Sequence, residues 1–355
     1  MSWFLAFAGF AALIILHEFG HFVAAKAVGM RVERFGLFFP PFIVKKRIGE
    51  TEYGVGAIPL GGFVKITGMN PEEELPPDIA PRAYYHQPVW KRIVVIGAGP
   101  FMNLVIAFLI LFGLAFGANE LTSRVAETAP GSPAARVLNP TDRIISVDGV
   151  RGDQTDLARQ ISKHRCPGDP RPGCLARTPA VVQVERDGRV LTIRVRPRYD
   201  PDQGRTLIGF TFATRPLNPS VREAADTSVD LMWAVTKGTV EAIARIFDPE
   251  QREQISGVVG SYEITRQAIE FDTRRALAVL AVVSLSLAIV NLFPFLPLDG
   301  GHIFWSLVEK LRGRPAPFRI MEQSGYLGFM LVIFLFVIGL SNDIGRLTGG
   351  GFDTR

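Results

Sequence analysis

The residues best suited to chemistry are His17-Glu18-Phe19-Gly20-His21, which lie inside an otherwise apolar stretch. On a helix, residues i and i+4 share a face, so both imidazoles can reach one metal ion while Glu18 accepts a proton from a water beside it. The alternatives are a chance match or two core histidines with satisfied hydrogen bonds. Ionisable groups inside a membrane span are costly and usually functional. The location therefore favours a metal site.

A catalytic zinc usually takes three protein ligands and leaves a fourth position for water. No His, Asp or Glu follows His21 until Glu33, so the third ligand must come from another segment. Asp299 is the candidate, because it lies at an apolar edge in Asn291-Leu-Phe-Pro-Phe-Leu-Pro-Leu-Asp-Gly-Gly-His302. The prolines and glycines of this run should unwind the helix, which is tolerated at membrane depth where the backbone lines a cavity.

Two alternatives to this third ligand stay open. Asp299 can instead cap the following helix, with the prolines and glycines marking the end of the span. His302 is a rival ligand, although it lies three residues further from the apolar stretch and nearer the water. The remaining histidines, His86 and His164, lie in polar loops and are expected to be ordinary surface residues.

Four apolar stretches must position these residues. Of the 355 residues, 48% are apolar and only 21% are charged, and the mean hydropathy of +0.22 places part of the chain in lipid. A helix that crosses the hydrocarbon core needs about 20 residues. We expect transmembrane helices over 1–26, 93–119, 276–301 and 323–342. The first stretch could instead be a signal peptide, but it lacks a basic n-region and carries three ionisable groups.

The cations that flank these stretches predict the topology. The loop from Lys26 to Arg92 holds ten Lys and Arg residues, and the loop at 302–322 holds four. The positive-inside bias makes both loops cytoplasmic. Both termini, including the tail at 343–355, and the segments 120–213 and 214–275 are then extracytoplasmic. A net charge of +5, spread along the chain, is too weak to indicate a nucleic-acid partner.

Together these residues resemble the site-2 protease family of intramembrane zinc metalloproteases, in its bacterial RseP-like branch with a single PDZ domain. The resemblance covers nearly the whole chain and rests on four motifs: the H-E-F-G-H run, Gly54-Val-Gly-Ala-Ile-Pro-Leu-Gly-Gly-Phe-Val-Lys65, Gly99-Pro-Phe-Met-Asn103, and Asn291 with Leu298-Asp-Gly300. It implies a polytopic α-helical membrane protein with a re-entrant β-hairpin or sheet and an inserted extracytoplasmic PDZ (α+β) domain.

The resemblance also implies the chemistry. Zinc (Zn²⁺) would be held by His17, His21 and Asp299, with Glu18 as the catalytic base and Asn291 positioning the substrate. The implied substrate is a transmembrane segment of another protein in a bacterial inner membrane, either an anti-sigma factor or a remnant signal peptide. A metal-binding transporter or an inactive PDZ scaffold is the alternative, and it predicts that Glu18 is dispensable.

The segment 27–92 contains three short runs that read as strands, 42–48, 51–59 and 62–67, with turns at Gly49-Glu50 and Gly61-Gly62. A transmembrane substrate hides its carbonyls in its own hydrogen bonds and must unwind before attack. An exposed strand edge could hold the unwound chain by strand addition. The alternative is a small cytoplasmic sheet that only packs against the spans.

The segment 120–213 resembles one bacterial PDZ domain, with a hairpin at 181–185 and 190–195. It either captures peptides or acts as a plug that excludes substrates with large outer domains. Cys166 and Cys174 flank a turn-rich run, and outside the cytoplasm they can form a disulfide; two idle thiols are the alternative. Apolar residues at helical spacing predict an amphipathic helix over 221–247, lying at the membrane surface or against the PDZ domain.

Overall fold

The computed structural model describes residues 1–70, 73–245, 248 and 257–348. The chain divides into two compact units, one made of Met1–Ala115 with Ser220–Arg355 and the other of Phe116–Pro219. The predicted outer domain at 120–213 lies inside the second unit. Each unit is described separately below.

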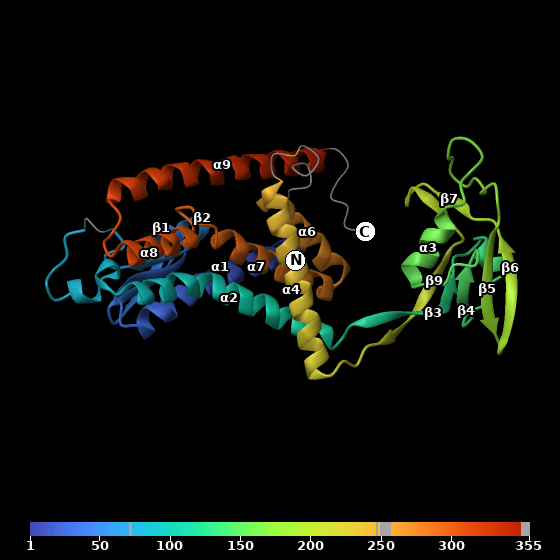
Figure 1. The fold of residues 1–355 in the computed structure, drawn as a ribbon, viewed down its shortest axis with the longest axis horizontal. Coiled ribbons are helices and arrows are strands. Elements are labelled where there is room, and N and C mark those ends of the chain that lie inside the picture. Colours follow the sequence, from blue (N-terminus) through green and yellow to red (C-terminus); the bar gives the residue numbers. More distant parts are fainter. Residues whose placement is uncertain (71–72, 246–247, 249–256, 349–355) are drawn as a thin grey trace. The chain divides into compact units, whose positions relative to one another are not determined.

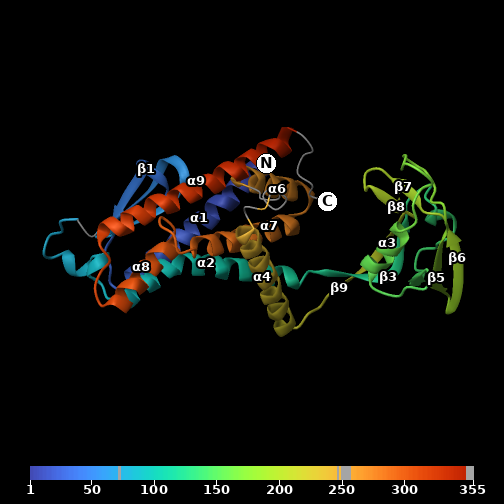
Figure 2. The same ribbon diagram turned by 45° about the horizontal axis from the view of Figure 1, so that its top comes forward.

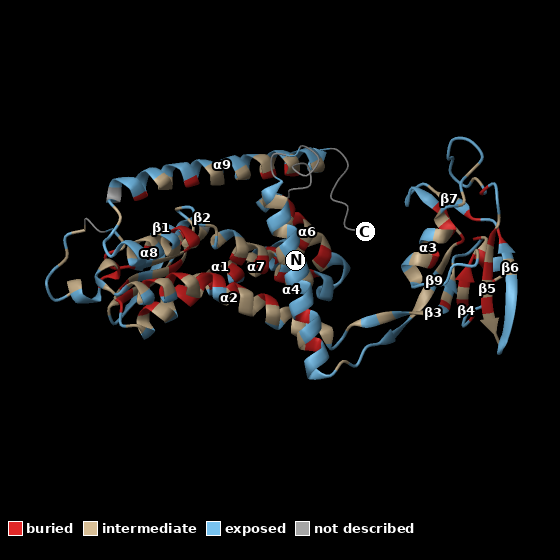
Figure 3. Cartoon of the chain, viewed as in Figure 1, coloured by how far each residue is buried: buried red, intermediate tan, exposed pale blue. Residues whose placement is uncertain are grey.

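The first unit contains four helices that are long and apolar enough to cross a membrane (Figure 1). They are α1 (Ser2–Ala27), α2 (Val89–Ala115), α7 (Thr273–Asn291) and α9 (Phe318–Thr348). Only about a sixth to a third of each apolar window is buried, and α9 shows mostly exposed residues in Figure 3. Apolar side chains left facing outward need a lipid solvent, so this is a membrane protein.

Helix ends differ from the prediction at the second, third and fourth spans. The second was expected over 93–119, but α2 covers Val89–Ala115 and the strand β3 (Asn119–Thr128) follows it. The third span was expected to run to residue 301, but α7 ends at Asn291, because Pro294 and Pro297 cannot continue it. A separate helix, α8 (Asp299–Arg312), replaces most of the loop expected at 302–322. The fourth helix continues to Thr348, past the expected end at 342, because polar residues continue a helix that hydropathy alone would end.

Two more helices complete the first unit: α4 (Val221–Ala244) and α6 (Val258–Phe271). Helix α4 begins with a capping box between Ser220 and Glu223 and crosses α2 steeply in both ribbon views (Figures 1 and 2). It matches the predicted amphipathic helix up to Ala244, and the predicted residues 246–247 lie outside the described part. The backbone amides of Gly260 in α6 and of Gly257, the residue before this helix, donate to the buried Asp343 carboxylate of α9.

After α1 the chain forms a β-sheet from β1 (Val32–Ile48) and β2 (Thr51–Ile66). Two short 3-10 helices follow, η1 (Ala80–Arg82) and η2 (Tyr84–His86). The turn expected at 49–50 is confirmed, since Ile48 pairs with Thr51. The element β2 runs through the turn expected at Gly61-Gly62. Residues 34–37 nevertheless pair with 52–55 on one side and with 62–65 on the other, so the chain reverses direction between Val55 and Gly62. Segments 42–48 and 62–66 are therefore the two edges.

The second unit is built on one five-stranded sheet in the order β6-β5-β4-β3-β9. Its elements are β3 (Asn119–Thr128), η3 (Ala134–Arg136), β4 (Arg143–Val147), α3 (Gln154–Ser162), β5 (Ala180–Arg186), β6 (Arg189–Val195), β7 (Arg198–Asp200), β8 (Arg205–Leu207) and β9 (Phe210–Pro216). The predicted hairpin of β5 and β6 is confirmed. A separate apolar core, including Val125, Leu157 and Val182, stabilises the unit.

Polar contacts fix the loops of the second unit. Cys166 and Cys174 are joined in a disulfide. His164, expected to be an ordinary surface residue, is partly buried and bonded on both ring nitrogens, to Asp148 at 2.7 Å and to Thr178 at 2.8 Å. The Arg186 guanidinium donates twice to Asp142 and holds the pKa of that carboxyl below its usual range. His86, in the first unit, is exposed as expected.

Candidate metal centre

Three predicted residues from two distant segments meet inside the first unit. The Nε2 atoms of His17 and His21 lie 3.2 Å and 3.4 Å from Asp299 Oδ2, and 3.3 Å from each other. One ligand atom from each residue falls within 4.8 Å of the others, a cluster able to hold one metal ion. The i, i+4 spacing on α1 therefore places both imidazoles on one face, and α8 brings Asp299 to them.

Glu18 lies in the same hollow of about 470 Å³ as these three side chains. Asn291 and His302 line it too, but His302 is not one of the clustered ligand atoms. The edge segment 62–66 forms a further wall, and a Cβ added at Gly62 would lie only 2.7 Å from Glu18 Cγ. The hollow thus places a carboxylate, the His–His–Asp cluster and a strand edge side by side.

Helix α2 contacts the Nδ1 atoms of both imidazoles, which are the ring nitrogens that face away from Asp299. His21 Nδ1 lies 2.9 Å from the Val95 carbonyl oxygen, and His17 Nδ1 lies 3.1 Å from the Asn103 amide. Sequence reasoning assigned no role to Asn103. The available signal was a polar side chain inside the apolar span, four residues after Gly99 in the quoted motif.

The break between α7 and α8 positions Asp299. Asp299 is the first residue of α8, so its carboxylate lies at the positive end of the helix dipole. The loop 292–296 folds tightly onto this first turn, and a Cβ at Gly300 would collide with the Leu292 carbonyl. The unwinding is therefore followed directly by a new helix, but Asp299 does not cap it: Leu298 is the N-cap residue and no side chain caps the helix.

The charges of the hollow suit a divalent cation. Its described lining holds two carboxylates, Glu18 and Asp299, and no Lys or Arg. Asp299 Oδ2 is buried without a hydrogen bond of good geometry, although both imidazoles lie close. An unpaired buried carboxylate oxygen is costly. Two imidazole nitrogens and one carboxylate oxygen are ligands that zinc accepts, so the residues present fit the ion.

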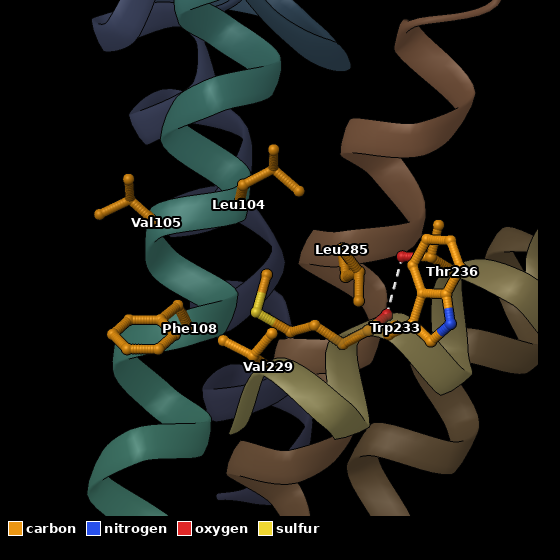
Figure 4. A pocket seen from close by; sticks show the side chains of 8 residues that line it. Leu104, Val105, Phe108, Val229, Trp233, Thr236 and Leu285 are labelled. Carbon is orange, nitrogen blue, oxygen red and sulfur yellow. Dashed lines mark hydrogen bonds between the residues drawn. The ribbon is translucent and has the colours of Figure 1, made fainter. Parts of the chain in front are cut away.

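A second hollow in the first unit lacks these features. Figure 4 shows it between α2 and α4, where Leu104 and Phe108 lie opposite Val229 and Trp233. Its volume is about 380 Å³, and its described lining carries no ionisable side chain. It offers an apolar surface and no reactive group, so the chemistry belongs to the hollow around Glu18.

A histidine pair with an adjacent glutamate, set on a helix able to cross a membrane, is typical of a membrane-embedded, metal-dependent hydrolase. The comparison with known families agrees. Residues 5–335 match the model of Peptidase family M50, and the chain belongs to this site-2 protease family. It is a zinc metalloprotease.

Relatives of similar length support the same assignment. The chain is 29% identical to the putative zinc metalloprotease Cj1068 of Campylobacter jejuni, over 95% of this chain and 91% of that one. It is 31% identical to the putative zinc metalloprotease CPE1693 of Clostridium perfringens, over 96% and 97%. It is 32% identical to the zinc metalloprotease Rip1 of Mycobacterium tuberculosis, over 84% and 83%.

Proposed function

We propose that the protein cleaves transmembrane segments of single-pass membrane proteins, with His17, His21 and Asp299 holding zinc and Glu18 acting as the general base. The observation that carries this is the clustering of these four side chains in one hollow of the membrane-spanning unit. The substrate is an anti-sigma factor or a remnant signal peptide. The metal-binding transporter or inactive scaffold is the competing function, and the Glu18 variant described in the Discussion tests it.

The proposed reaction is hydrolysis of a peptide bond. When bound, zinc supplies Lewis-acid polarisation of the scissile carbonyl and acidifies water. Glu18 accepts a proton from the attacking water and delivers it to the leaving amine, so one side chain acts first as the base and then as the acid. Asn291 lines the same hollow, and its amide would hold the substrate backbone by hydrogen bonds.

The edge segment 62–66 is the proposed holder of the unwound substrate. Thr67 N donates to the Arg31 carbonyl, toward the inner strand. Because N–H groups of successive strand residues alternate between edges, those of Val64 and Ile66 point away from the inner strand, and the Val64 N–H donates to the Glu18 carboxylate. Both residues line the hollow beside Glu18. Strand addition here would present an extended backbone to the metal in any sequence context.

Replacing Val64 by proline tests this holding role. The change removes one edge N–H, which also donates to the Glu18 carboxylate, and we expect cleavage to fall about tenfold, the effect of one lost hydrogen bond of about 1.4 kcal/mol. A rise in KM is the result that substrate holding requires, whereas a fall confined to kcat would report the lost Val64–Glu18 contact and contradict strand addition. Zinc content should stay unchanged, because Val64 is not one of the three clustered ligand residues. Ile43→Pro, on the opposite edge and 71% exposed, is the matched control and should cleave normally. Full activity of the Val64 variant would contradict strand addition.

The second unit is proposed to be a PDZ-like domain. Its sheet ends in the edge strand β9, and a groove of about 360 Å³ runs between β9 and α3. Phe210 and Phe212 line one wall and Ala158 and Ile161 the other. A strand edge beside a helix is the geometry by which such domains take up a peptide, and it supports capture over a mere plug.

Filling the groove separates capture from exclusion. Ala158→Trp should weaken cleavage of all substrates severalfold if the groove binds peptide, and Arg159→Trp, on the exposed side of α3, should not. Replacing 116–219 by a Gly–Ser linker completes the test. A plug predicts normal cleavage by the Ala158 variant and new cleavage of untrimmed substrates by the linker variant. The measurement is product formation in membranes.

The proposed setting is a bacterial inner membrane. The sheet region between α1 and α2 and the α8 region carry clusters of Lys and Arg, which favour the cytoplasmic side. Both termini and the second unit are then extracytoplasmic. A disulfide between Cys166 and Cys174 is in keeping with this placement, because such bonds persist outside the cytoplasm.

A further inference from the structure

The two imidazoles are anchored by chemically different groups. His21 Nδ1 faces the Val95 carbonyl oxygen, which can only accept a hydrogen bond. His21 therefore carries its proton on Nδ1, and its Nε2 lone pair is free on the side of Asp299. His17 Nδ1 instead faces the Asn103 side-chain amide at 3.1 Å, and an amide offers both a donor and an acceptor.

The position of His17 Nε2 decides which amide atom must face the ring. This nitrogen lies 3.2 Å from Asp299 Oδ2 and 3.3 Å from His21 Nε2, so a cation held there needs its lone pair. The neutral ring must then carry its proton on Nδ1, and the partner of Nδ1 must be an acceptor. With Nδ2 toward His17, Asn103 Oδ1 has no partner among the described residues, although Asn103 is fully buried.

We propose that Asn103 is the positioning residue of His17. Its amide is turned so that Oδ1 accepts the Nδ1–H proton, which fixes the tautomer and the ring plane; the two amide atoms are alike in shape, so the hydrogen-bond network decides. This proposal rests on the ligand set given above. It goes further by assigning the function of a side chain that does not touch substrate or metal.

The packing of α2 against α1 supports this role. Val95, Gly99 and Asn103 recur every four residues and so share one face of α2, as His17 and His21 do on α1. A Cβ at Gly99 would collide with the His21 ring, so the glycine leaves space for that imidazole. Asn103, one turn later on the same face, contacts the His17 imidazole. The Ser284 hydroxyl of α7 donates to the backbone carbonyl oxygen of Asn103 at 2.9 Å, which connects this turn of α2 to a third helix.

Zinc affinity of the purified full-length protein, measured by competition with a chelator, tests the proposal. Asn103→Leu keeps the shape but removes the acceptor, and we expect about 10- to 100-fold weaker zinc binding, the usual effect of losing an outer partner of a ligand. Asn103→Asp keeps an acceptor and should hold zinc within a few-fold of the native protein. Val105→Leu, on the same helix at the apolar hollow, is the matched control.

The outcomes separate this proposal from the ligand set. Native zinc affinity in Asn103→Leu, with zinc lost in His17→Ala, would overturn the role of Asn103 and leave the ligands standing. Unchanged zinc affinity in His17→Ala and His21→Ala would overturn the ligand set itself. If Asn103→Leu does not fold, Asn103→Asp decides alone, since affinity as weak as in His17→Ala would contradict an acceptor role.

Discussion

Glu18→Gln should abolish cleavage while leaving zinc in place. Glutamine matches glutamate in shape, but its amide cannot accept the proton of the attacking water, and general-base catalysis contributes about 10²- to 10⁴-fold to rate. The His17–His21–Asp299 cluster does not include Glu18, so its ligand atoms remain. Product formation from a single-pass substrate and bound zinc should be measured on the same preparation.

The control for Glu18→Gln is Glu74→Gln, an exposed glutamate outside the hollow, which should cleave normally. Unchanged cleavage by the Glu18 variant would refute the proposed mechanism and favour the transporter or scaffold. Loss of zinc together with cleavage would show that Glu18 contributes to the site itself. Zinc retained with cleavage lost is the result that the hydrolytic mechanism requires.

Asp299→Ala should remove both zinc and cleavage, whereas His302→Ala should retain zinc. Asp299 Oδ2 lies within 3.4 Å of both imidazole Nε2 atoms, and without it two ligands remain. The loss of affinity should exceed the roughly 10- to 100-fold expected for an outer partner such as Asn103. His302 shares the hollow but not the ligand cluster. Chelator competition on both variants compares the two rivals directly, and zinc lost only from the His302 variant would reverse the assignment.

The sequence predicted best where function depends on local spacing. His17 and His21 could be paired from four-residue spacing alone, and Asp299 stood out as an acid among helix breakers. The unwinding near Pro294 and Pro297 followed from proline chemistry, although the span was expected to continue to residue 301 and α7 ends at Asn291. Local patterns left open whether Asp299 ligates the metal or caps a following helix, because hydropathy indicates lipid contact and not where helices begin and end.

Residues whose role depends on the pairing of distant elements were missed. Asn103 gains its role only when α2 lies antiparallel against α1, and nothing within its own helix indicates His17 as the partner. The order of strands in the β1–β2 sheet was hidden for the same reason, since residues 34–37 enter between two segments of one later strand. His164 was expected to be a surface residue, because its hydrogen-bond partners Asp148 and Thr178 are distant from it in the sequence.

The pairing of β3 with β9 has a consequence for how this architecture can change. Asn119 pairs with Pro216, and Leu217 N donates to the Ala118 carbonyl, so the chain enters and leaves the second unit through two adjacent strands. At that stem the whole unit is equivalent to the loop of a hairpin. Duplication, exchange or loss of the unit therefore requires no new path for the remaining chain. Such a stem allows the second unit to be exchanged as a whole while the residues around Glu18 in the first unit stay unchanged.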